Sequence, residues 1–314
     1  MLLGAVILSW TYREFDWSKV NGVFWHEMDW KWMLLSLPFG VLAQMFRGWR
    51  WKQTLEPMGE KPKVRHCVNS IFVSYAANLL VPRVGEISRC GILKRYDGVS
   101  FTKSLGTVVT ERIIDSLCIL VITGITLLSQ MGVFHVFFKE TGTDLNSIMD
   151  KFNPVHYIIL GISALAILVL FVYLLKKLSF FAMVKEKYQN LCEGIFSLRS
   201  VRNKPLFVFY TLAIWVSYIL HFSLTLYAFE FTSGLGFIAS LVMFAVGSIA
   251  VVVPTPNGAG PWHFAVITML TLYGVGEEEA GIFALLVHSI QTLLIIVLGV
   301  WGLIALSLDK NKIE

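Results

Sequence analysis

Three apolar runs of the length needed to cross a lipid bilayer constrain this chain more than any other feature. They are Val155–Leu175, Leu206–Phe229 and Ala280–Leu308, and about 20 apolar residues are needed to cross a bilayer as a helix. Charged residues make up 15% of the sequence, against about 25% in typical soluble domains. We therefore expect an all-α polytopic membrane protein, and we expect no nucleic-acid partner.

Basic residues gather in particular loops, and they predict the orientation of the chain. Lysine and arginine follow the predicted span Trp30–Trp51, fill the segment Lys176–Lys204 and return at Lys310 and Lys312. Loops on the cytoplasmic side of membrane proteins are enriched in these residues. These segments and the C-terminus are therefore predicted to be cytoplasmic. Residues 178–204 have the pattern of an amphipathic helix that lies on the inner surface.

Two further apolar segments are flanked on both sides by loops of the same predicted face. Residues 67–93 lie between two basic loops, and residues 237–273 lie between Glu230 and the acidic run that starts at Glu277. A segment that enters and leaves on one face is a re-entrant hairpin. The prediction is about six spanning helices plus two oppositely oriented re-entrant hairpins.

The two hairpins belong to segments that align with each other as an internal repeat. Val81-Pro82 aligns with Val253-Pro254, and Gly106 and Gly124 have the same separation as Gly281 and Gly299. Glycine spacing alone is also compatible with chance, but the topology derived from the charges is independent and agrees. We predict one transmembrane domain over 1–314 built as an inverted repeat, with halves of about 1–130 and 154–308.

Charged residues surround the tip of the first hairpin. Pro82 stops the first arm, and the helix 102–130 carries further charges near the middle of a hydrocarbon core about 30 Å thick. A charge at that depth costs roughly 2.5–3.5 kcal/mol unless it is paired, so a compensated cluster is expected. The predicted members are Arg83, Gly85, Glu86, Arg89, Glu111, Arg112 and Asp115. The cluster either locks the hairpin to its neighbour or forms a polar cavity for a lipid headgroup.

The tip of the second hairpin carries glycine and proline instead of charge. Glycine allows close backbone approach and unusual dihedral angles, and proline ends a helix. The candidate binding residues of this half are Pro254, Pro256, Asn257, Gly258, Gly260 and His263. His288 and Gln291, one turn apart on the last helix, are further candidates because they occupy the register of the Glu111–Asp115 segment. A single histidine in a membrane is more often a packing residue. No metal site, cofactor or catalytic motif is predicted.

These motifs together resemble the transmembrane region of lysylphosphatidylglycerol synthases, a flippase-like membrane family. The resemblance rests on Asn78…Pro82-Arg83…Gly85-Glu86…Arg89, on Glu111-Arg112…Asp115 and on Pro254-Thr255-Pro256…Gly258…Gly260. It implies an inner-membrane protein that moves a charged or glycosylated lipid between leaflets. The chain departs from the family at Asn257-Gly258, His263 and His288, and no aminoacyltransferase domain is expected in the sequence 1–314.

Three function classes remain open from the sequence. The first is a lipid flippase-like transporter whose partners are membrane lipids with an anionic or glycosylated headgroup. The second is a membrane-embedded transferase on lipid-linked substrates, for which Glu86, Glu111 or Asp115 would serve as acid or base. The third is a scaffold for a separate lipid-modifying enzyme.

Overall fold

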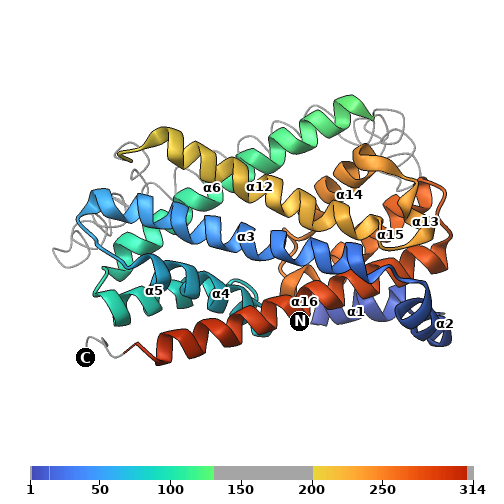
Figure 1. Cartoon of the computed structure of the whole chain (residues 1–314), viewed down its shortest axis with the longest axis horizontal. Helices are drawn as coiled ribbons and strands as arrows, with labels where there is room; N and C mark the ends of the chain where they lie inside the picture. Colours follow the sequence, from blue (N-terminus) through green and yellow to red (C-terminus); the bar gives the residue numbers. More distant parts are fainter. Residues whose placement is uncertain (1, 14, 131–200, 310–314) are drawn as a thin grey trace, which may run out of the picture.

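The computed structural model describes residues 2–13, 15–130 and 201–309, and all regular structure in these ranges is helical (Figure 1). This confirms the predicted all-helical class. The main helices are α1 (Leu2–Thr11), α3 (Trp30–Leu55), α4 (Val64–Leu80), α5 (Val84–Asp97), α6 (Phe101–Ser129), α12 (Lys204–Leu226), α14 (Gly236–Ala250), α15 (Pro261–Leu272) and α16 (Glu277–Ser307). Shorter pieces are α2 (Trp17–Gly22), η1 (Val23–Glu27), η2 (Glu56–Met58), α13 (Glu230–Ser233) and η3 (Pro256–Gly258).

Three of the described helices, α6, α12 and α16, are long and apolar enough to cross a membrane. They coincide with the predicted spans 102–130, 206–229 and 280–308. The predicted span Val155–Leu175 and nearly all of the predicted surface segment 178–204 lie outside the described residues. The total of about six spans therefore stays a prediction.

The long helices expose apolar side chains on their outer faces. On α6, Leu117 and Leu120 are 57% and 66% exposed, and on α12 Val208 and Leu212 are 55% and 60% exposed. An exposed helix face of this composition is unfavourable in water and matches the hydrocarbon of a bilayer. The described helices thus have the surface of a membrane protein.

Helices α4 and α5 form an antiparallel pair, which we call the first pair. Pro82 lies in the turn between them, and the backbone of α5 touches that of α4 at Gly85, where an added Cβ would be 2.0 Å from the Ser74 oxygen. At the other end, the His66 ring of α4 contacts the Asp97 carboxylate of α5. The pair contains the predicted hairpin 67–93, whose re-entry into the membrane stays a prediction.

Helices α14 and α15 form the corresponding second pair, over the predicted hairpin 237–273. Their connection contains Pro254 and η3, and its backbone has positive φ angles at Asn257, Gly258 and Gly260. Near this connection α14 approaches α15 so closely that a Cβ added to Gly247 would be 3.0 Å from the Trp262 Nε1 atom. The chain therefore reverses here as it does at Pro82.

Helices of the first half pack on helices of the second half (Figure 1). Helix α3 packs on α12, α4 packs on α16, and α14 packs on α6. The turn of the first pair and η3 of the second pair meet near the middle of the molecule, where the Arg83 Nη2 atom donates to the Val252 carbonyl at 3.4 Å. One apolar core surrounds Trp51, Cys67, Ile71 and Leu93 in the first half. Another surrounds Phe222, Met243, Met269 and Phe283, mainly in the second half.

Two glycines allow α16 to lie directly on α4. A Cβ added to Gly299 would be 2.2 Å from the Ala76 Cβ, and one added to Gly302 would be 2.9 Å from the Asn69 carbonyl oxygen. Small residues at a helix interface let the two backbones approach, as is common in membrane proteins. The last described helix is in this way fitted to the first pair.

Candidate functional site: a buried arginine–carboxylate network

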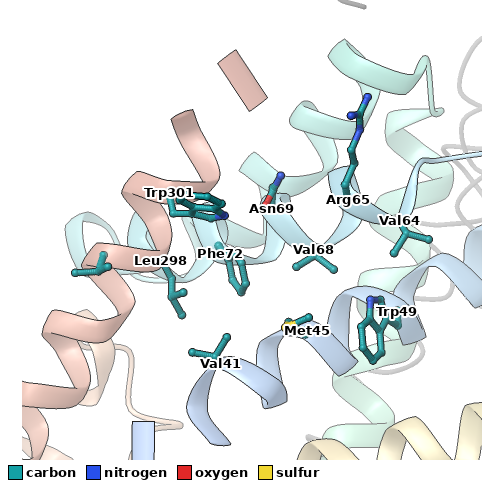
Figure 2. A pocket seen from close by; sticks show the side chains of 11 residues that line it. Val41, Met45, Trp49, Val64, Arg65, Val68, Asn69, Phe72, Leu298 and Trp301 are labelled. Carbon is teal, nitrogen blue, oxygen red and sulfur yellow. The ribbon is translucent and has the colours of Figure 1, made fainter. Parts of the chain in front are cut away.

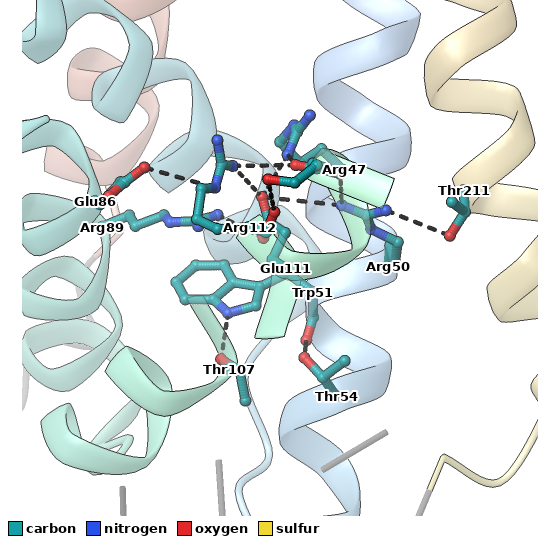
Figure 3. A network of polar contacts seen from close by, with 12 residues as sticks. Arg47, Arg50, Trp51, Thr54, Glu86, Arg89, Thr107, Glu111, Arg112 and Thr211 are labelled. Carbon is teal, nitrogen blue, oxygen red and sulfur yellow. Dashed lines mark hydrogen bonds and ion pairs between the residues drawn. The ribbon is translucent and has the colours of Figure 1, made fainter. Parts of the chain in front are cut away.

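Arginines and carboxylates from three helices form a buried network in the first half of the molecule (Figure 3). Each of its five central residues is at most 5% exposed. They are Arg47 and Arg50 of α3, Arg89 of α5, and Glu111 and Asp115 of α6. Charges that are buried this deeply must be paired, because the desolvation cost of each ion is several kcal/mol.

Helix α6 supplies the two carboxylates from one side. Glu111 and Asp115 are four residues apart, so they lie one above the other on the helix, while Ile113 and Leu117 on the other side are more than half exposed. Asp115 accepts from Arg47 Nη1 at 2.6 Å and from Arg50 Nη2 at 2.9 Å. Each carboxylate oxygen of Asp115 therefore has its own arginine.

Glu111 connects α6 to both α3 and α5. Its Oε2 atom accepts from Arg89 Nη1 at 3.0 Å, and its Oε1 atom accepts from Arg47 and from Arg112 Nη2, the latter at 2.6 Å. The Arg112 side chain is 44% exposed, and its Nε atom lies 3.5 Å from Glu86 Oε1. The network thus extends from a closed interior to an accessible edge at Arg112 and Glu86.

The Trp51 indole ring holds Arg89 in place. The Arg89 guanidinium carbon is 4.6 Å from the centre of this ring, a cation–π contact. The Trp51 Nε1 atom in turn donates to Thr107 Oγ1 at 2.8 Å. Residues of α3 and α6 therefore fix the one arginine that α5 contributes to the centre.

The positive charges of the network outnumber the negative ones. Its arginines are 47, 50, 89 and 112 and its carboxylates are 86, 111 and 115, a sum of four positive and three negative charges. Three buried donor atoms, Arg47 Nε, Arg89 Nε and Arg89 Nη2, make no hydrogen bond with the part of the chain that the structure describes. One negative charge with acceptor atoms would complete the network.

The structure places the predicted residues of the first half in two groups. Glu86, Arg89, Glu111, Arg112 and Asp115 meet in the network as expected, whereas Arg83 lies at the turn and points to Val252. Gly85 contributes a backbone N–H that donates to Asn78 Oδ1 at 2.8 Å. The predicted polar cavity is closed: the pocket that touches Arg50 and Glu111 holds about 10 Å³, room for about one water molecule.

Sequence reasoning missed Arg47 and Arg50, which were assigned to the cytoplasmic flank of their helix. Arg47 and Arg50 are three residues apart, close to one helical turn, so both lie on the side of α3 that faces α6. Arg50 also donates to Thr211 Oγ1 of α12 at 3.3 Å. A further pair that was not predicted is Tyr75 and Tyr218, whose hydroxyls are 2.7 Å apart next to Arg47.

The predicted residues of the second half form a separate, uncharged group. The His288 Nε2 atom is 3.1 Å from the Asn257 carbonyl, and Asn257 Nδ2 donates to Thr292 Oγ1 at 3.0 Å. The rings of His263 and His288 are 4.5 Å apart between centres. The Gln291 Nε2 atom is buried without a hydrogen bond to any described residue. Pro254, Pro256, Gly258 and Gly260 shape the connection that carries Asn257.

Helix α1 packs against this second group. A Cβ added to Gly260 would be 2.9 Å from the Gly4 carbonyl oxygen, so only glycine fits there at φ 93°. The Tyr12 ring contacts His263 edge-on, with ring centres 5.9 Å apart. Within the described ranges, no group of three or more His, Cys, Asp or Glu side chains is placed to hold a metal ion.

Comparison with known proteins identifies the family of this chain. The family model described as "Lysylphosphatidylglycerol synthase TM region" matches residues 1–299. The chain belongs to this family. This confirms the resemblance that the motifs around Arg83, Glu111 and Pro254 indicate, and together with the apolar helices it makes the chain an integral membrane protein.

A curated protein is similar to this family member over most of the length of the chain. The glycosyltransferase AglD of Haloferax volcanii is 24% identical over 298 residues, which cover 86% of this chain and 48% of that relative. The chain therefore spans about half the length of the relative that it matches.

Proposed function

We propose that this protein moves a lipid with an anionic or glycosylated headgroup between the leaflets of a cytoplasmic membrane. The headgroup passes the network of Arg47, Arg50, Arg89, Glu111 and Asp115. Membership of a family described by a lipid synthase supports a lipid as substrate. The chain would sit with its C-terminus on the cytoplasmic side, as the basic loops predict.

The excess of arginine in the network is the observation that carries this proposal. A network that served only to join helices would be expected to balance its charges and to satisfy its donors, because unpaired groups in a low-dielectric interior are costly. Here one positive charge is left over, and Arg89 keeps two buried donor atoms without a described partner. An arginine fork binds a phosphate or carboxylate with two parallel hydrogen bonds.

Transport requires the closed site to open, and the meeting point of the two helical pairs is where we place the gate. Broken helices from inverted repeats that meet near the membrane centre are a recurrent transporter plan. The similar packing of α4 on α16 and of α14 on α6 supports such a repeat. In this proposal both pairs are re-entrant hairpins, and their separation at Arg83 and Val252 opens a path from the accessible edge at Arg112 and Glu86 to the closed centre.

A leaflet assay in proteoliposomes tests the proposal. Vesicles carry fluorescent lipids with anionic, glycosylated or zwitterionic headgroups, and a membrane-impermeant reductant bleaches only the outer leaflet. The wild-type protein is expected to make the inner-leaflet population of one headgroup class accessible. Failure with every lipid class of the native membrane, under a proton gradient, a sodium gradient and no gradient, would overturn the proposal.

Arg83→Gly is the informative variant for this assay. Arg83 has a left-handed backbone with φ 65°, which glycine adopts at no steric cost, so the turn is retained while the guanidinium is removed. Transport is expected to fall at least about tenfold, because the guanidinium at the proposed gate no longer offers the arriving headgroup a charge-assisted contact. Arg95→Gln, an exposed arginine at the other end of α5, is the matched control and is expected to transport normally.

The name of the Haloferax volcanii relative favours a second candidate, chemistry on lipid-linked sugars. In that case this chain is the membrane part of a transferase, or a scaffold for one, and Glu86 at the accessible edge is its candidate acid or base. Lipid mass spectrometry of a deletion strain, combined with leaflet labelling, separates the candidates. A missing lipid species favours the transferase, and a lipid confined to the wrong leaflet favours the transporter.

A further inference from the structure

A groove of about 650 Å³ runs along the outer wall of the bundle between α3, α4 and α16 (Figure 2). Its walls are apolar and include Met45 and Trp49 of α3, Phe72 of α4, and Leu298 and Trp301 of α16. Ligand sites in proteins typically have volumes of about 300–1,000 Å³. The groove is distinct from the arginine network, because α3 turns Met45 and Trp49 to the groove and Arg47 and Arg50 to the network.

Helix α4 gives this groove a polarity that changes along its length. Arg65, Asn69 and Phe72 line it in succession, at positions i, i+4 and i+7 of one helix face (Figure 2). The order is therefore a cation, a neutral amide and a hydrocarbon side chain. A phospholipid presents the complementary order: a phosphate, then an ester carbonyl, then an acyl chain.

The packing of the surrounding described helices gives no hydrogen-bond partner to the polar side chain of Asn69. Asn69 is part of an otherwise apolar wall, and its side-chain amide makes no hydrogen bond to any described residue. In lipid, an amide without a partner is costly. A donor placed among apolar residues is what a binding groove uses to fix one end of a ligand.

The charge at the Arg65 end selects the headgroup. Arg65 is 62% exposed and forms an ion pair with Asp309 at 2.5 Å. The Lys63 Nζ atom lies 3.9 Å from Asp309 Oδ2. Lys61, two residues before Lys63, is exposed. Asp309 also accepts from the His66 ring, so the single carboxylate is shared and the edge of the groove keeps a positive charge. Basic residues at a membrane surface attract anionic lipids.

We propose that this groove binds one molecule of an anionic phospholipid from the surrounding leaflet. Its phosphate pairs with Arg65, its ester group accepts from the Asn69 amide, and one acyl chain lies between Met45, Phe72 and Leu298. Each buried methylene of that chain adds to the hydrophobic stabilisation of the bound lipid. The site does not depend on lipid transport, since it lies on the opposite side of α3 from the network.

Native mass spectrometry of the delipidated, detergent-purified protein tests this site without an activity assay. Phosphatidylglycerol and phosphatidylcholine with the same acyl chains are titrated separately. We expect one phosphatidylglycerol to bind, with an apparent affinity about tenfold above that of phosphatidylcholine. Equal affinity for both lipids, or no discrete bound species, would overturn the proposal.

Two pairs of variants locate the binding on the molecule. Val297→Trp fills the groove, whereas Val300→Trp on the same helix is a control because Val300 is also exposed but does not line the groove. Only the first is expected to abolish the bound lipid. Arg65→Gln should remove the preference for phosphatidylglycerol, and Asn69→Leu should weaken both lipids. If Val297→Trp and Val300→Trp bind equally, the lipid lies elsewhere and the proposal is wrong.

Discussion

The Arg83 guanidinium of the first helical pair donates to the Val252 carbonyl, next to the second pair, across an Nη2–O distance of 3.4 Å. This contact joins two segments that lie far apart in the sequence and that correspond in the predicted repeat. Among the described residues it is also the only polar contact that Arg83 makes. The contact therefore marks the point at which the two halves of the molecule meet.

Locking this meeting point is expected to stop transport. Cysteines introduced by Arg83→Cys and Val252→Cys, joined by a short thiol-specific cross-linker, should hold the two pairs together. Transport in the proteoliposome assay is expected to stop and to return when a cleavable linker is reduced. The two single variants treated with the same reagent are the controls. Wild-type rates in the cross-linked double variant would show that the pairs do not separate.

Removal of one central carboxylate is expected to destabilise the protein strongly. Glu111→Gln leaves Arg47 and Arg89 buried with less compensating charge, and breaking a buried pair costs about 3–5 kcal/mol. Glu86→Gln removes only an edge contact at 3.5 Å, whose carboxylate side chain is 28% exposed, and should cost less than about 1 kcal/mol. Unfolding in mixed micelles with increasing SDS measures both. Equal losses would contradict a closed centre and an accessible edge.

A methyl group at Gly85 is expected to separate the first pair. The Cβ of Gly85→Ala would meet the Ser74 carbonyl oxygen, an atom of the backbone that cannot rotate away. The expected loss of stability is about 1–3 kcal/mol. Gly91→Ala on the same helix is the matched control, since nothing lies within 4 Å of its added Cβ. That variant should keep or slightly raise the melting temperature, because alanine favours a helix over glycine.

The His66 ring is expected to hold three helix ends together. Its Nδ1 atom is 2.8 Å from Asp97 Oδ1 at the end of α5, and its Nε2 atom is 2.6 Å from Asp309 Oδ2 after α16. His66→Leu should cost about 1–3 kcal/mol, because the buried Asp97 Oδ1 atom loses its contact with the ring and Asp309 loses one of its several contacts. Hydrogen exchange should rise in the first turn of α4 and the last turn of α16.

Tyr96→Phe is the control for that experiment. The Tyr96 ring lies 5.6 Å from the His66 ring between centres, and phenylalanine keeps this packing. Exchange at the ends of α4 and α16 should stay at the wild-type rate. Faster exchange in both variants would attribute the effect to loosened packing and not to the two carboxylate contacts.

Local signals in the sequence were sufficient to place the elements that carry the site. Pro82 marks the turn between α4 and α5, and Glu111 and Asp115 share the inner side of α6 because four residues are close to one helical turn. His288, which occupies the register of the Glu111–Asp115 segment in the predicted repeat, contacts Asn257 and His263 in the structure. Each of these depends on residues close in sequence or on a repeat that can be aligned.

The missed residues depend on burial between helices, which no local pattern reports. Arg47 and Arg50 precede Lys52 and a basic loop, so the rule for cytoplasmic flanks placed them at the surface. The six charged residues of the predicted cluster, three arginines and three carboxylates, have a net charge of zero. The charge balance therefore did not indicate that further arginines take part. Arg83 was counted in the cluster because it is near Glu86 in sequence, but its left-handed backbone directs it to Val252.

The close fit of α16 on α4 at Gly299 and Gly302 has a consequence for how the protein is made. Helix α4 leaves the ribosome early, and α16 is the last described helix to follow. Chains grow at about 5–20 residues per second. The α4 surface around Ala76 and Asn69 therefore has no contact with α16 until the rest of the chain is translated. During that interval the unpaired surface must be covered by lipid or by an insertion chaperone. A chain truncated before α16 should therefore be cleared by membrane proteases even if every preceding helix has formed.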